Sequence, residues 1–304
     1  MTDSKPTISI GLPVYNGDDY LEGAIKSILA QTFTDFELLI CDNASTDRTQ
    51  EICEKYANLD RRIRYHRNEE NLGAARNFNL SVELARGEYF KWMAHDDLLE
   101  ATYLEKCYQG IVAHPEVILS YPRTMDIDKN GKHLRPKNFD LRESSTDPTE
   151  RFLHFTCVEH SCFQVFGLMK RELLLSTPMI GSYVASDRVL LVLLCVKGPF
   201  YEVPEELYYH REHPERSTRV VKSLQLMLGW FDPTKKGKKS MPYWRMFVEY
   251  FKIIFKSQLS FGQKLKCCWH MVRWVKRHLG DLSRDLIFYL RLTFFGQPGG
   301  APGK

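Results

Sequence analysis

Two adjacent carboxylates, Asp96 and Asp97, are the residues of this 304-residue chain best suited to chemistry. They follow the aromatic segment 87–93, which is typical of a buried strand, and two leucines come directly after them. Neighbouring carboxylates repel each other, so a pair at the end of a strand favours a bound cation or a network of hydrogen-bond donors. Because such pairs also occur in solvated turns, the pair alone does not decide between these interpretations.

The two strands expected near the start of the chain also end in polar side chains. Residues 8–12 are typical of a strand and so are residues 37–41, and these strands run into Pro13, Tyr15, Asn16, Asp42 and Asn43. Open parallel sheets bind ligands outside the carboxyl ends of their strands. We therefore expect these residues and the Asp96–Asp97 pair to face one site.

Strands and amphipathic helices alternate through the first hundred residues. The pattern predicts strands and helices in turn at 8–12, 18–31, 37–41, 49–56, 63–66, 74–85 and 89–93. Repeated strand–helix alternation is typical of a mainly parallel sheet with helices on both faces, which is an α/β fold.

The alternation is looser after residue 100. The pattern predicts helices at 102–113, from 148 and at 187–197, and strands at 117–121, at 163–169 and, as a short final one, within 199–211. Residues 126–148 form a polar excursion, and residues 233–242, rich in Lys, Gly and Pro, are expected to be a linker. We therefore divide the chain into regions 1–100, 101–232 and 233–304.

Composition narrows the class of protein. The eight cysteines show no Cys-x-x-Cys spacing and several lie in apolar runs, so we expect reduced core residues rather than disulfides or zinc ligands. No uninterrupted apolar run reaches the roughly 18 residues of a membrane span. The first residues also lack a basic segment followed by an apolar one, so we expect a cytoplasmic chain.

Four motifs in order resemble the family 2 glycosyltransferases. They are Pro13-Val14-Tyr15-Asn16 with the run 27–33, the segment 36–47, Asn71-Leu72-Gly73 with Ala75-Arg76-Asn77, and Gly87-Glu88-Tyr89. The likeness extends over residues 6–125 and, less strongly, to 220. It implies the GT-A fold, a Rossmann-like nucleotide-diphospho-sugar transferase domain, and an inverting, non-processive enzyme. Many members carry an Asp-x-Asp-Asp string, and its first position here is Ala94.

The resemblance places the nucleotide-sugar site in region 1–100. The residues implied for it are Pro13, Tyr15, Asn16, Asp42, Asn43, Asn71, Gly73, Arg76 and Asp96. Asp42 resembles the family's base-recognising acid, which accepts a hydrogen bond from uracil, although its position also suits a helix cap. Arg76 would either contact the diphosphate or lie exposed on its helix. Gly73 fits a tight turn.

The resemblance also implies a divalent cation. The diphosphate leaves as an anion, and a cation lowers the barrier by neutralising the charge that develops. Mg²⁺ or Mn²⁺ suits carboxylate oxygens, so we expect Asp96, Asp97 and His213 to be its ligands. His213 follows the last expected strand at a place where relatives use a histidine, and a lone surface histidine is the alternative.

Region 101–232 is implied to bind the acceptor, a saccharide or a lipid-linked sugar. A hydroxyl is a poor nucleophile without a base, and the resemblance puts the family's catalytic base at Asp187. Asp187 also suits the start of a helix. His160 either lines the acceptor cleft or is a satisfied structural histidine.

The last region is basic. From Lys235 onward 15 Lys and Arg stand against three acids, whereas the rest of the chain has 27 bases and 35 acids. Residues 243–295 interleave these bases with Trp, Phe and Leu, which predicts amphipathic helices on an anionic membrane surface, with the protein peripheral on the inner face of the cell membrane. Packing of the apolar face on the catalytic domain is the alternative. We expect no nucleic acid partner, since the body is acidic and carries no binding motif.

The sequence therefore predicts a metal-dependent glycosyltransferase that takes a UDP-sugar and acts in cell-surface polysaccharide synthesis. A non-catalytic relative that binds nucleotide sugars or scaffolds a membrane assembly is one alternative, and Ala94 favours it. A nucleotidyltransferase is another, but its Gly-rich, basic loop after the first strand is absent, because residues 13–19 are acidic instead.

Overall fold

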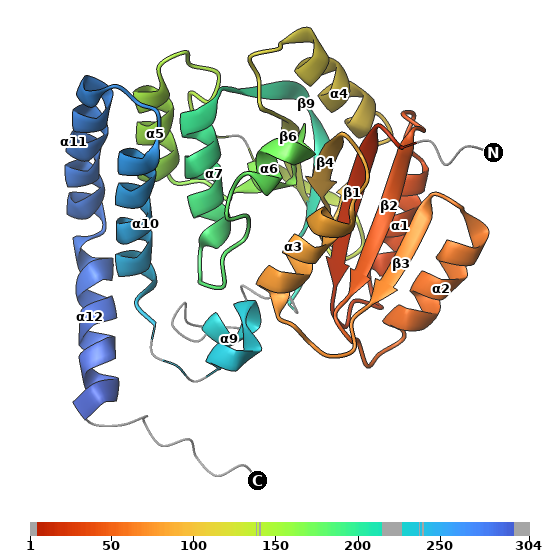
Figure 1. Cartoon of the computed structure of the whole chain (residues 1–304). Coiled ribbons are helices and arrows are strands. Elements are labelled where there is room, and N and C mark those ends of the chain that lie inside the picture. The colour runs from red at the N-terminus through yellow and green to blue at the C-terminus, as the bar shows by residue number, and fades with distance from the viewer. Residues whose placement is uncertain are drawn as a thin grey trace.

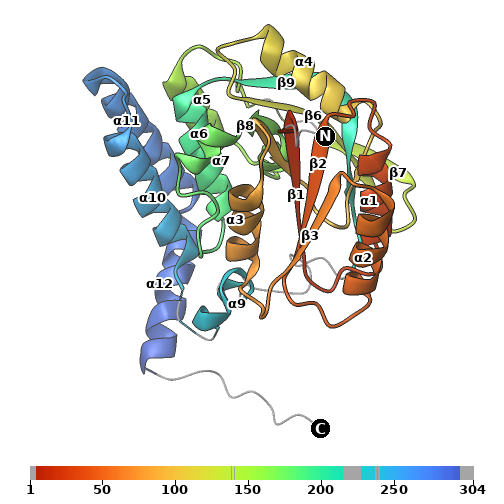
Figure 2. The same cartoon turned by 45° about the vertical axis from the view of Figure 1, so that its right-hand side comes forward.

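The computed structural model describes residues 5–137, 139, 141–214, 227–236, 238 and 240–294. In this part of the chain nine strands form one sheet with helices on both of its faces, and the expected α/β fold is confirmed (Figure 1). An arm of three helices lies along one side of the molecule (Figures 1 and 2). These helices are α10 (Pro242–Lys256), α11 (Phe261–Arg277) and α12 (Leu279–Phe294).

Four parallel strands form one half of the sheet, in the order β3–β2–β1–β4. They and their connecting helices are β1 (Ile8–Val14), α1 (Leu21–Leu29), β2 (Phe36–Asp42), α2 (Thr49–Leu59), β3 (Ile63–Arg67), α3 (Ala74–Leu84) and β4 (Tyr89–Trp92). Every residue of β1 and β2 is buried, as expected of central strands covered on both faces. The predicted alternation of this region is confirmed, although α1 is shorter than expected.

Antiparallel pairing joins the second half of the sheet to β4. Strand β8 (Leu168–Lys170) pairs with β4 and with β6 (Leu119–Ile127), which in turn pairs in parallel with β9 (Phe200–Arg211). The short strands β5 (Leu98–Leu99) and β7 (His133–Lys137) pair with β9 and β6. The sheet is therefore continuous across residue 100, and the functional division of residues 1–232 into two halves stays a prediction.

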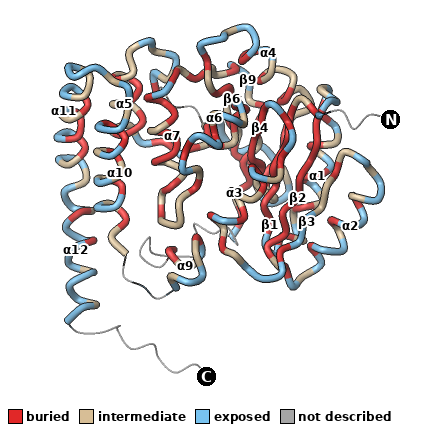
Figure 3. Tube along the Cα trace, viewed as in Figure 1, coloured by how far each residue is buried: buried red, intermediate tan, exposed pale blue. Residues whose placement is uncertain are grey.

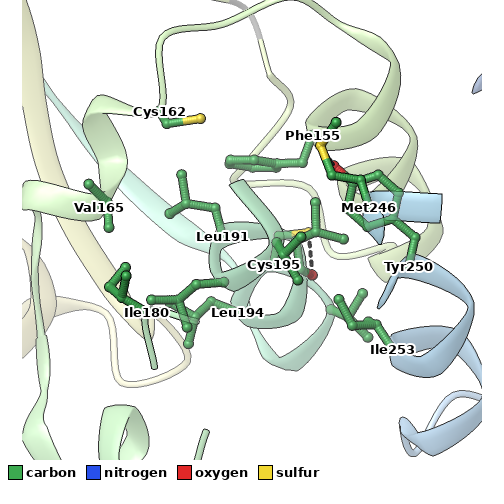
Figure 4. Close-up of a cluster of buried hydrophobic side chains, with 14 of the residues drawn as sticks. Phe155, Cys162, Val165, Ile180, Leu191, Leu194, Cys195, Met246, Tyr250 and Ile253 are labelled. Carbon is green, nitrogen blue, oxygen red and sulfur yellow. Dashed lines mark hydrogen bonds between the residues drawn. The ribbon is translucent and has the colours of Figure 1, made fainter. Parts of the chain in front are cut away.

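The helices of the second half are α4 (Tyr103–Ala113), α5 (Pro148–Cys157), α6 (Arg171–Leu175) and α7 (Ser186–Lys197), and the three that the sequence predicts are confirmed. Figure 4 shows Leu191, Leu194 and Cys195 of α7 among side chains from neighbouring elements, including Phe155, Met246, Tyr250 and Ile253. Because Tyr250 is fully buried in this cluster, α10 belongs to the core of the catalytic fold.

Several strands differ from the prediction. The strand expected at 117–121 is β6, which extends to Ile127, and β7 lies within the expected polar excursion. The strand expected at 163–169 is a 3-10 helix, η1 (Phe163–Phe166), followed by the short β8. The left-handed φ of 59° at Cys162 turns the chain out of the extended conformation there. The final strand, β9, has 12 residues and is longer than expected. A break in the register leaves Pro204 and Glu205 without partners in β6, and pairing with β6 resumes beyond them.

The elements before the helical arm are short. Helix α9 (Leu228–Phe231) is followed by the 3-10 helix η2 (Pro233–Lys235), which lies in the expected linker. Helix α11 begins with a capping box, in which Ser260 and Gln263 bond each other's backbone N–H groups. Among the described residues we find no helix with the length and apolar character needed to span a bilayer.

A buried acid anchors the start of β2. Glu37 accepts hydrogen bonds from the Ser9 hydroxyl at 2.6 Å, the Arg86 backbone N–H at 2.6 Å and the guanidinium groups of Arg64 at 2.9 Å and Arg86 at 3.1 Å. Burial alone would raise the pKa of Glu37, but these hydrogen bonds and the charge of Arg64 hold it below its ordinary value. Glu37 therefore stabilises the fold as a carboxylate.

We expect Glu37→Gln to lower the free energy of unfolding by about 2–3 kcal/mol at pH 7, because the amide removes the charge that both arginines face. The folded-state pKa of Glu37 lies below the unfolded one, so its stabilisation is present above the unfolded pKa and is lost as the pH falls through the folded value. Urea unfolding at several pH values should show the two proteins converging in acid. The control, Glu54→Gln on the exposed face of α2, should change little, and an equal loss in it would contradict the assignment.

Candidate active site

The ends of β4 and β9 meet at the two carboxylates. Asp96 Oδ2 lies 2.9 Å from Nε2 of His213, and the Arg211 guanidinium donates to the Asp96 carbonyl oxygen at 2.7 Å. Asp97 accepts from the Arg211 backbone N–H at 2.8 Å and from the Tyr208 hydroxyl. The end of β9 and the residues after it therefore fix the positions of both acids.

These two acids have opposite electrostatic environments. Burial, followed by the charge of Asp96, raises the pKa of Asp97 to about 6. Burial acts in the same direction on Asp96, but the hydrogen bond from His213 and the charges of His95 and His213 outweigh it, so the pKa of Asp96 lies well below its ordinary value. Asp96 is therefore the member of the pair that carries its negative charge most firmly.

A buried lysine lies close to this pair. Lys91 on β4 has no exposed surface, and its ammonium donates to the Trp92 carbonyl oxygen at 3.0 Å. The ammonium also lies 4.5 Å from the ring centre of Tyr103 and 6.0 Å from that of Tyr208. Burial lowers the pKa of Lys91 to about 7. Tyr208 thus faces a buried cation with its ring and donates its hydroxyl hydrogen to Asp97.

His213 is buried between β9 and the start of α1. Its ring centre lies 4.7 Å from that of Tyr20, and the Arg211 guanidinium lies 5.0 Å from the same tyrosine ring. Tyr20 therefore holds both side chains and keeps Nε2 of His213 directed at Asp96. These contacts rule out the lone surface histidine that the sequence left open.

Hydrogen bonds join the loops that follow β1 and β2. The Asn16 N–H donates to the Ser45 hydroxyl at 2.9 Å, and the Asn16 side-chain oxygen accepts from the Thr46 N–H at 2.9 Å. Pro13 is buried within β1, whereas Tyr15 is 46% exposed. A rigid loop thus presents an aromatic ring whose surface is open to a ligand.

Asp42 is fully buried at the end of β2. One carboxylate oxygen accepts from the Ser45 N–H at 2.9 Å. The other accepts from the Tyr65 hydroxyl at 2.8 Å and lies 3.4 Å from Nε of Arg67. In the structure Asp42 therefore organises the turn after β2, and its role in recognising a base stays a prediction.

Asparagines connect the end of β2 to the loop after β3. Asn43 donates to the Asn71 side-chain oxygen at 2.8 Å and accepts from the Asn68 amide at 3.0 Å. Asn71 also accepts from the Gly73 N–H at 2.9 Å. Gly73 has a φ of 82°, and a Cβ there would lie 2.6 Å from the Phe231 carbonyl oxygen, so only glycine lets α9 pack over this loop.

Arg76 lies on the exposed face of α3. Its guanidinium is 2.6 Å from the Glu83 carboxylate of the same helix. This contact corresponds to the exposed-helix alternative, and contact between Arg76 and a diphosphate stays a prediction.

Asp187 lies in the first turn of α7. The preceding Ala185 has a left-handed φ of 62°, a conformation that costs a residue with a Cβ about 1–2 kcal/mol. The neighbouring Ser186 hydroxyl is buried and has no hydrogen-bond partner among the described residues. Figure 1 shows this end of α7 at the side of the molecule where β1, β2 and β3 end. Strain next to an acid at this edge is a feature of functional sites.

His160 supports that turn. Its Nδ1 accepts from the Cys162 N–H at 3.2 Å, its Nε2 lies 3.2 Å from the Phe155 carbonyl oxygen, and its own carbonyl accepts from Arg188 at 2.7 Å. Burial, followed by the charge of Arg188, lowers the pKa of His160 to about 3, so the ring is neutral. His160 therefore matches the structural alternative for this residue.

A further acid–imidazole group lies on β6 and β9. Asp126, His210 and Glu212 offer potential metal-ligand atoms within 4.8 Å of one another. Asp126 already lies 2.9 Å from Nδ1 of His210, 3.3 Å from Arg135 and 3.4 Å from Lys137. Two cations beside one carboxylate oppose the binding of another, so this group is the weaker candidate for a metal site.

Asp96 and His213 fit a divalent cation better. Mg²⁺ holds its ligands at about 2.1 Å in octahedral geometry, so two neighbouring ligand atoms are about 3.0 Å apart. Asp96 Oδ2 and His213 Nε2 are joined by a hydrogen bond of 2.9 Å, so a cation bound between them would replace the shared proton. Both side chains are held by the surrounding structure, which is the condition for a preformed site.

Comparison with known proteins identifies the family of the chain. The model of the family described as glycosyl transferase family 2 matches residues 9–176, more than half of the chain. The chain belongs to glycosyl transferase family 2. It is thus a glycosyltransferase, and the family that the sequence predicts is confirmed.

Two curated family 2 relatives illustrate the range of the likeness. The uncharacterized glycosyltransferase MJ1057 of Methanocaldococcus jannaschii is 24% identical over 259 residues, which span 83% of this chain and 87% of that protein. The putative teichuronic acid biosynthesis glycosyltransferase TuaG of Bacillus subtilis is 40% identical over 106 residues, 35% of this chain and 42% of its own. The strongest identity is therefore local, whereas the weaker likeness extends over most of the chain.

Solved structures share the GT-A fold of this glycosyltransferase. S. aureus TarS 1–349 in complex with UDP has a TM-score of 0.66 and 18% identity, covering 96% of this chain and 77% of that one. The mannosyltransferase PcManGT from Pyrobaculum calidifontis, in complex with GDP-Man and Mn²⁺, has a TM-score of 0.57 and 15% identity, covering 99% and 78%. At these identities the likeness concerns the fold.

The sequence missed several residues that build the site of this family 2 enzyme. Tyr20, Tyr208 and Arg211 hold the acids and His213, and Asn68 holds the loop after β3. The available signal was the run Tyr208-Tyr209-His210-Arg211 at the end of β9. That pattern predicts a strand end but gives no partner for any of its side chains.

Proposed function

We propose that this glycosyltransferase moves one sugar, with inversion, from a UDP-sugar to a saccharide or lipid-linked acceptor. The observation that carries the proposal is the Asp96–His213 pair, two convergent ligand atoms after the carboxyl end of β4. Nucleotides bind at this edge of open α/β sheets. The UDP complex of S. aureus TarS, which shares the fold, supports UDP as the nucleotide of the donor.

In this proposal Asp96 and His213 hold Mg²⁺ or Mn²⁺. The bound cation supplies neutralising charge for the diphosphate that leaves. Asp96 is ionised without further change, because its pKa lies well below its ordinary value. A metal ion at Nε2 of His213 would displace the proton that this nitrogen donates to Asp96. Asp97 sets the position of Asp96 through the donors that it shares with β9, and direct metal contact by Asp97 stays a prediction.

The loops after β1, β2 and β3 would bind the nucleotide. The exposed ring of Tyr15 offers a surface on which a base can stack. Asn16 and the Asn43–Asn71 pair hold these loops in place, so little ordering is needed when the donor binds. The set proposed from the sequence also includes Pro13, Asp42, Gly73, Arg76 and Asp96.

Asp187 would act as the base that takes the proton of the acceptor hydroxyl. Its position in the first turn of α7 lets backbone N–H groups stabilise its charge before the reaction. The strained Ala185 fixes the direction in which the helix begins, and Arg188 ties the turn to His160.

The product is proposed to enter a cell-surface polysaccharide. The relative TuaG, which is named for teichuronic acid biosynthesis, supports this assignment for the family 2 domain.

We expect UDP with Mn²⁺ to raise the melting temperature of the wild type, because a ligand at 100 times its Kd stabilises the native state by about 2.7 kcal/mol. Asp96→Asn should lose the Mn²⁺-dependent part of the shift, since it removes one ligand atom. Asp126→Asn, in the other acid–imidazole group, should keep it. The opposite pattern would move the metal to Asp126, and no shift with UDP, GDP, CDP or dTDP would favour a non-catalytic relative.

We expect Asp187→Asn to lower the rate of sugar transfer by about 10²–10⁴-fold, because the amide cannot accept the proton. The UDP-dependent thermal shift should be unchanged, since Asp187 does not bind the nucleotide in this proposal. Asp281→Asn, in the first turn of α12, is the matched control and should leave the rate as it is. Full transfer activity in Asp187→Asn would remove the residue from the mechanism.

The helical arm is proposed to place the enzyme on the inner face of the cell membrane. One face of α11 packs on the body through Cys267, Met271 and Trp274, as the packing alternative requires. Another face remains exposed in Figure 3 and carries large apolar residues on α11 and α12, namely Phe261, Leu265, Trp269, Val272, Leu286, Ile287, Leu290 and Phe294. Lysines and arginines lie among them, which suits an anionic bilayer.

We expect the protein to co-sediment with vesicles that contain phosphatidylserine, and to do so less as salt is raised. The double variant Trp269→Gln/Ile287→Gln should bind about tenfold more weakly, because both side chains would insert into the bilayer. Leu59→Gln, at an exposed position on α2, should bind as the wild type does. Equal binding by all three proteins would contradict insertion through the arm.

A further inference from the structure

A groove of about 630 Å³ opens beside the start of α7. The loop of residues 181–184 lines one side of it, and this loop leads directly into the turn that carries Asp187. Residues of α10 line the other side, and Leu228, Lys235, Ser240 and Met241, which precede this helix, complete the described lining. The groove therefore lies between the loop that precedes the proposed base and the first helix of the arm.

The wall formed by α10 is apolar and held in place. It presents Trp244 and Val248, one turn apart and both exposed, although the opposite face of α10 lies in the core. The Trp244 indole N–H donates to the Leu282 carbonyl oxygen at 3.1 Å, so the edge of the ring is anchored to α12 and its surface is free to contact a ligand. Such a wall suits an aliphatic chain better than a sugar hydroxyl.

Two basic residues, Lys235 and Arg245, also line the groove. The Arg245 guanidinium lies 4.8 Å from the ring centre of Tyr183 and 2.8 Å from Glu249, and the Lys235 ammonium donates to the Ser182 carbonyl oxygen at 3.0 Å and lies 3.1 Å from Asp232. Among the described residues, the lining holds these two bases and no acid, because Glu249 and Asp232 lie outside it. The partners orient the cations, and the groove itself offers positive charge beside an apolar wall.

We propose that this groove binds the lipid end of a phosphate-bearing, lipid-linked acceptor. The hydrocarbon chain lies along Trp244 and Val248, and the phosphate lies between Lys235 and Arg245. The sugar end of the same acceptor then points toward Asp187. This inference rests on the proposed transfer reaction and names the acceptor class for it. Exposed apolar residues also lie on α11 and α12, the other helices of the same arm.

Calorimetric titration with dodecyl phosphate, kept below its micellar concentration, tests the groove without a natural acceptor. We expect the wild type to bind it and Val248→Gln to bind about tenfold more weakly, because a polar side chain replaces part of the apolar wall. Val112→Gln is the matched control, since Val112 is an exposed valine of α4, which does not line the groove. Equal weakening in both variants, or no binding by the wild type, would overturn the proposal.

The charge of the ligand is tested in the same way. Arg245→Gln should weaken dodecyl phosphate about tenfold and leave neutral dodecyl maltoside unchanged, because only the phosphate needs the cation. Equal loss for the two ligands would overturn the phosphate assignment. All variants should keep the UDP-dependent thermal shift. If the wild type showed no UDP-dependent shift, the proposed function would be contradicted. If it showed that shift but did not bind the alkyl phosphate, only the assignment of the groove would be contradicted.

Discussion

The hydrogen bonds between the end of β9 and the Asp96–Asp97 pair are the contacts on which the rest of the site depends. A buried carboxylate without donors is strongly unfavourable, so Asp97 requires both the Tyr208 hydroxyl and the Arg211 N–H. Both donors belong to β9, which follows α7 and Asp187 in the chain, whereas Asp97 comes after β4. The same contacts therefore hold β9 beside the segment that contains β5, and they also fix the positions of Asp96 and His213.

The burial of Lys91 beside this pair of acids is energetically unfavourable. An ammonium with no exposed surface loses the solvation of water, and its lowered pKa reports that loss. The rings of Tyr103 and Tyr208 and the Trp92 carbonyl oxygen replace part of it. Since Tyr208 also donates to Asp97, the cation and the carboxylate are connected through one ring. A hydrophobic residue at position 91 would pack well but would leave Tyr208 without that constraint.

The sequence could predict those features of the fold that are specified by local patterns of residues. The strands and helices of residues 1–100 follow in order, and each is specified by its own periodicity, so the fold class and most element positions were accessible. Strand β8 and the register break at Pro204 were not, because they depend on pairing with strands far away in sequence. The site divides in the same way. Motifs predict roles for Asp96, Asp187 and His213, whereas Tyr20 and Arg211 make contacts across long separations in sequence that no local spacing indicates.

The sequence of the helical arm is compatible with two roles, packing on the body of the protein and binding of lipid. Helix α10 buries Tyr250 and Ile254 in the core beside α7, and on its other side it exposes Trp244 and Val248. A helix with apolar residues on both sides gives the same composition whether it packs or binds lipid, and only the fold separates the two faces. The exposed side of α10 is joined to the proposed base through the chain, because the groove beside Trp244 and Val248 is also lined by the loop of residues 181–184, which leads into α7. The arm can thus couple the position of the enzyme on a surface to the place where the acceptor hydroxyl must arrive.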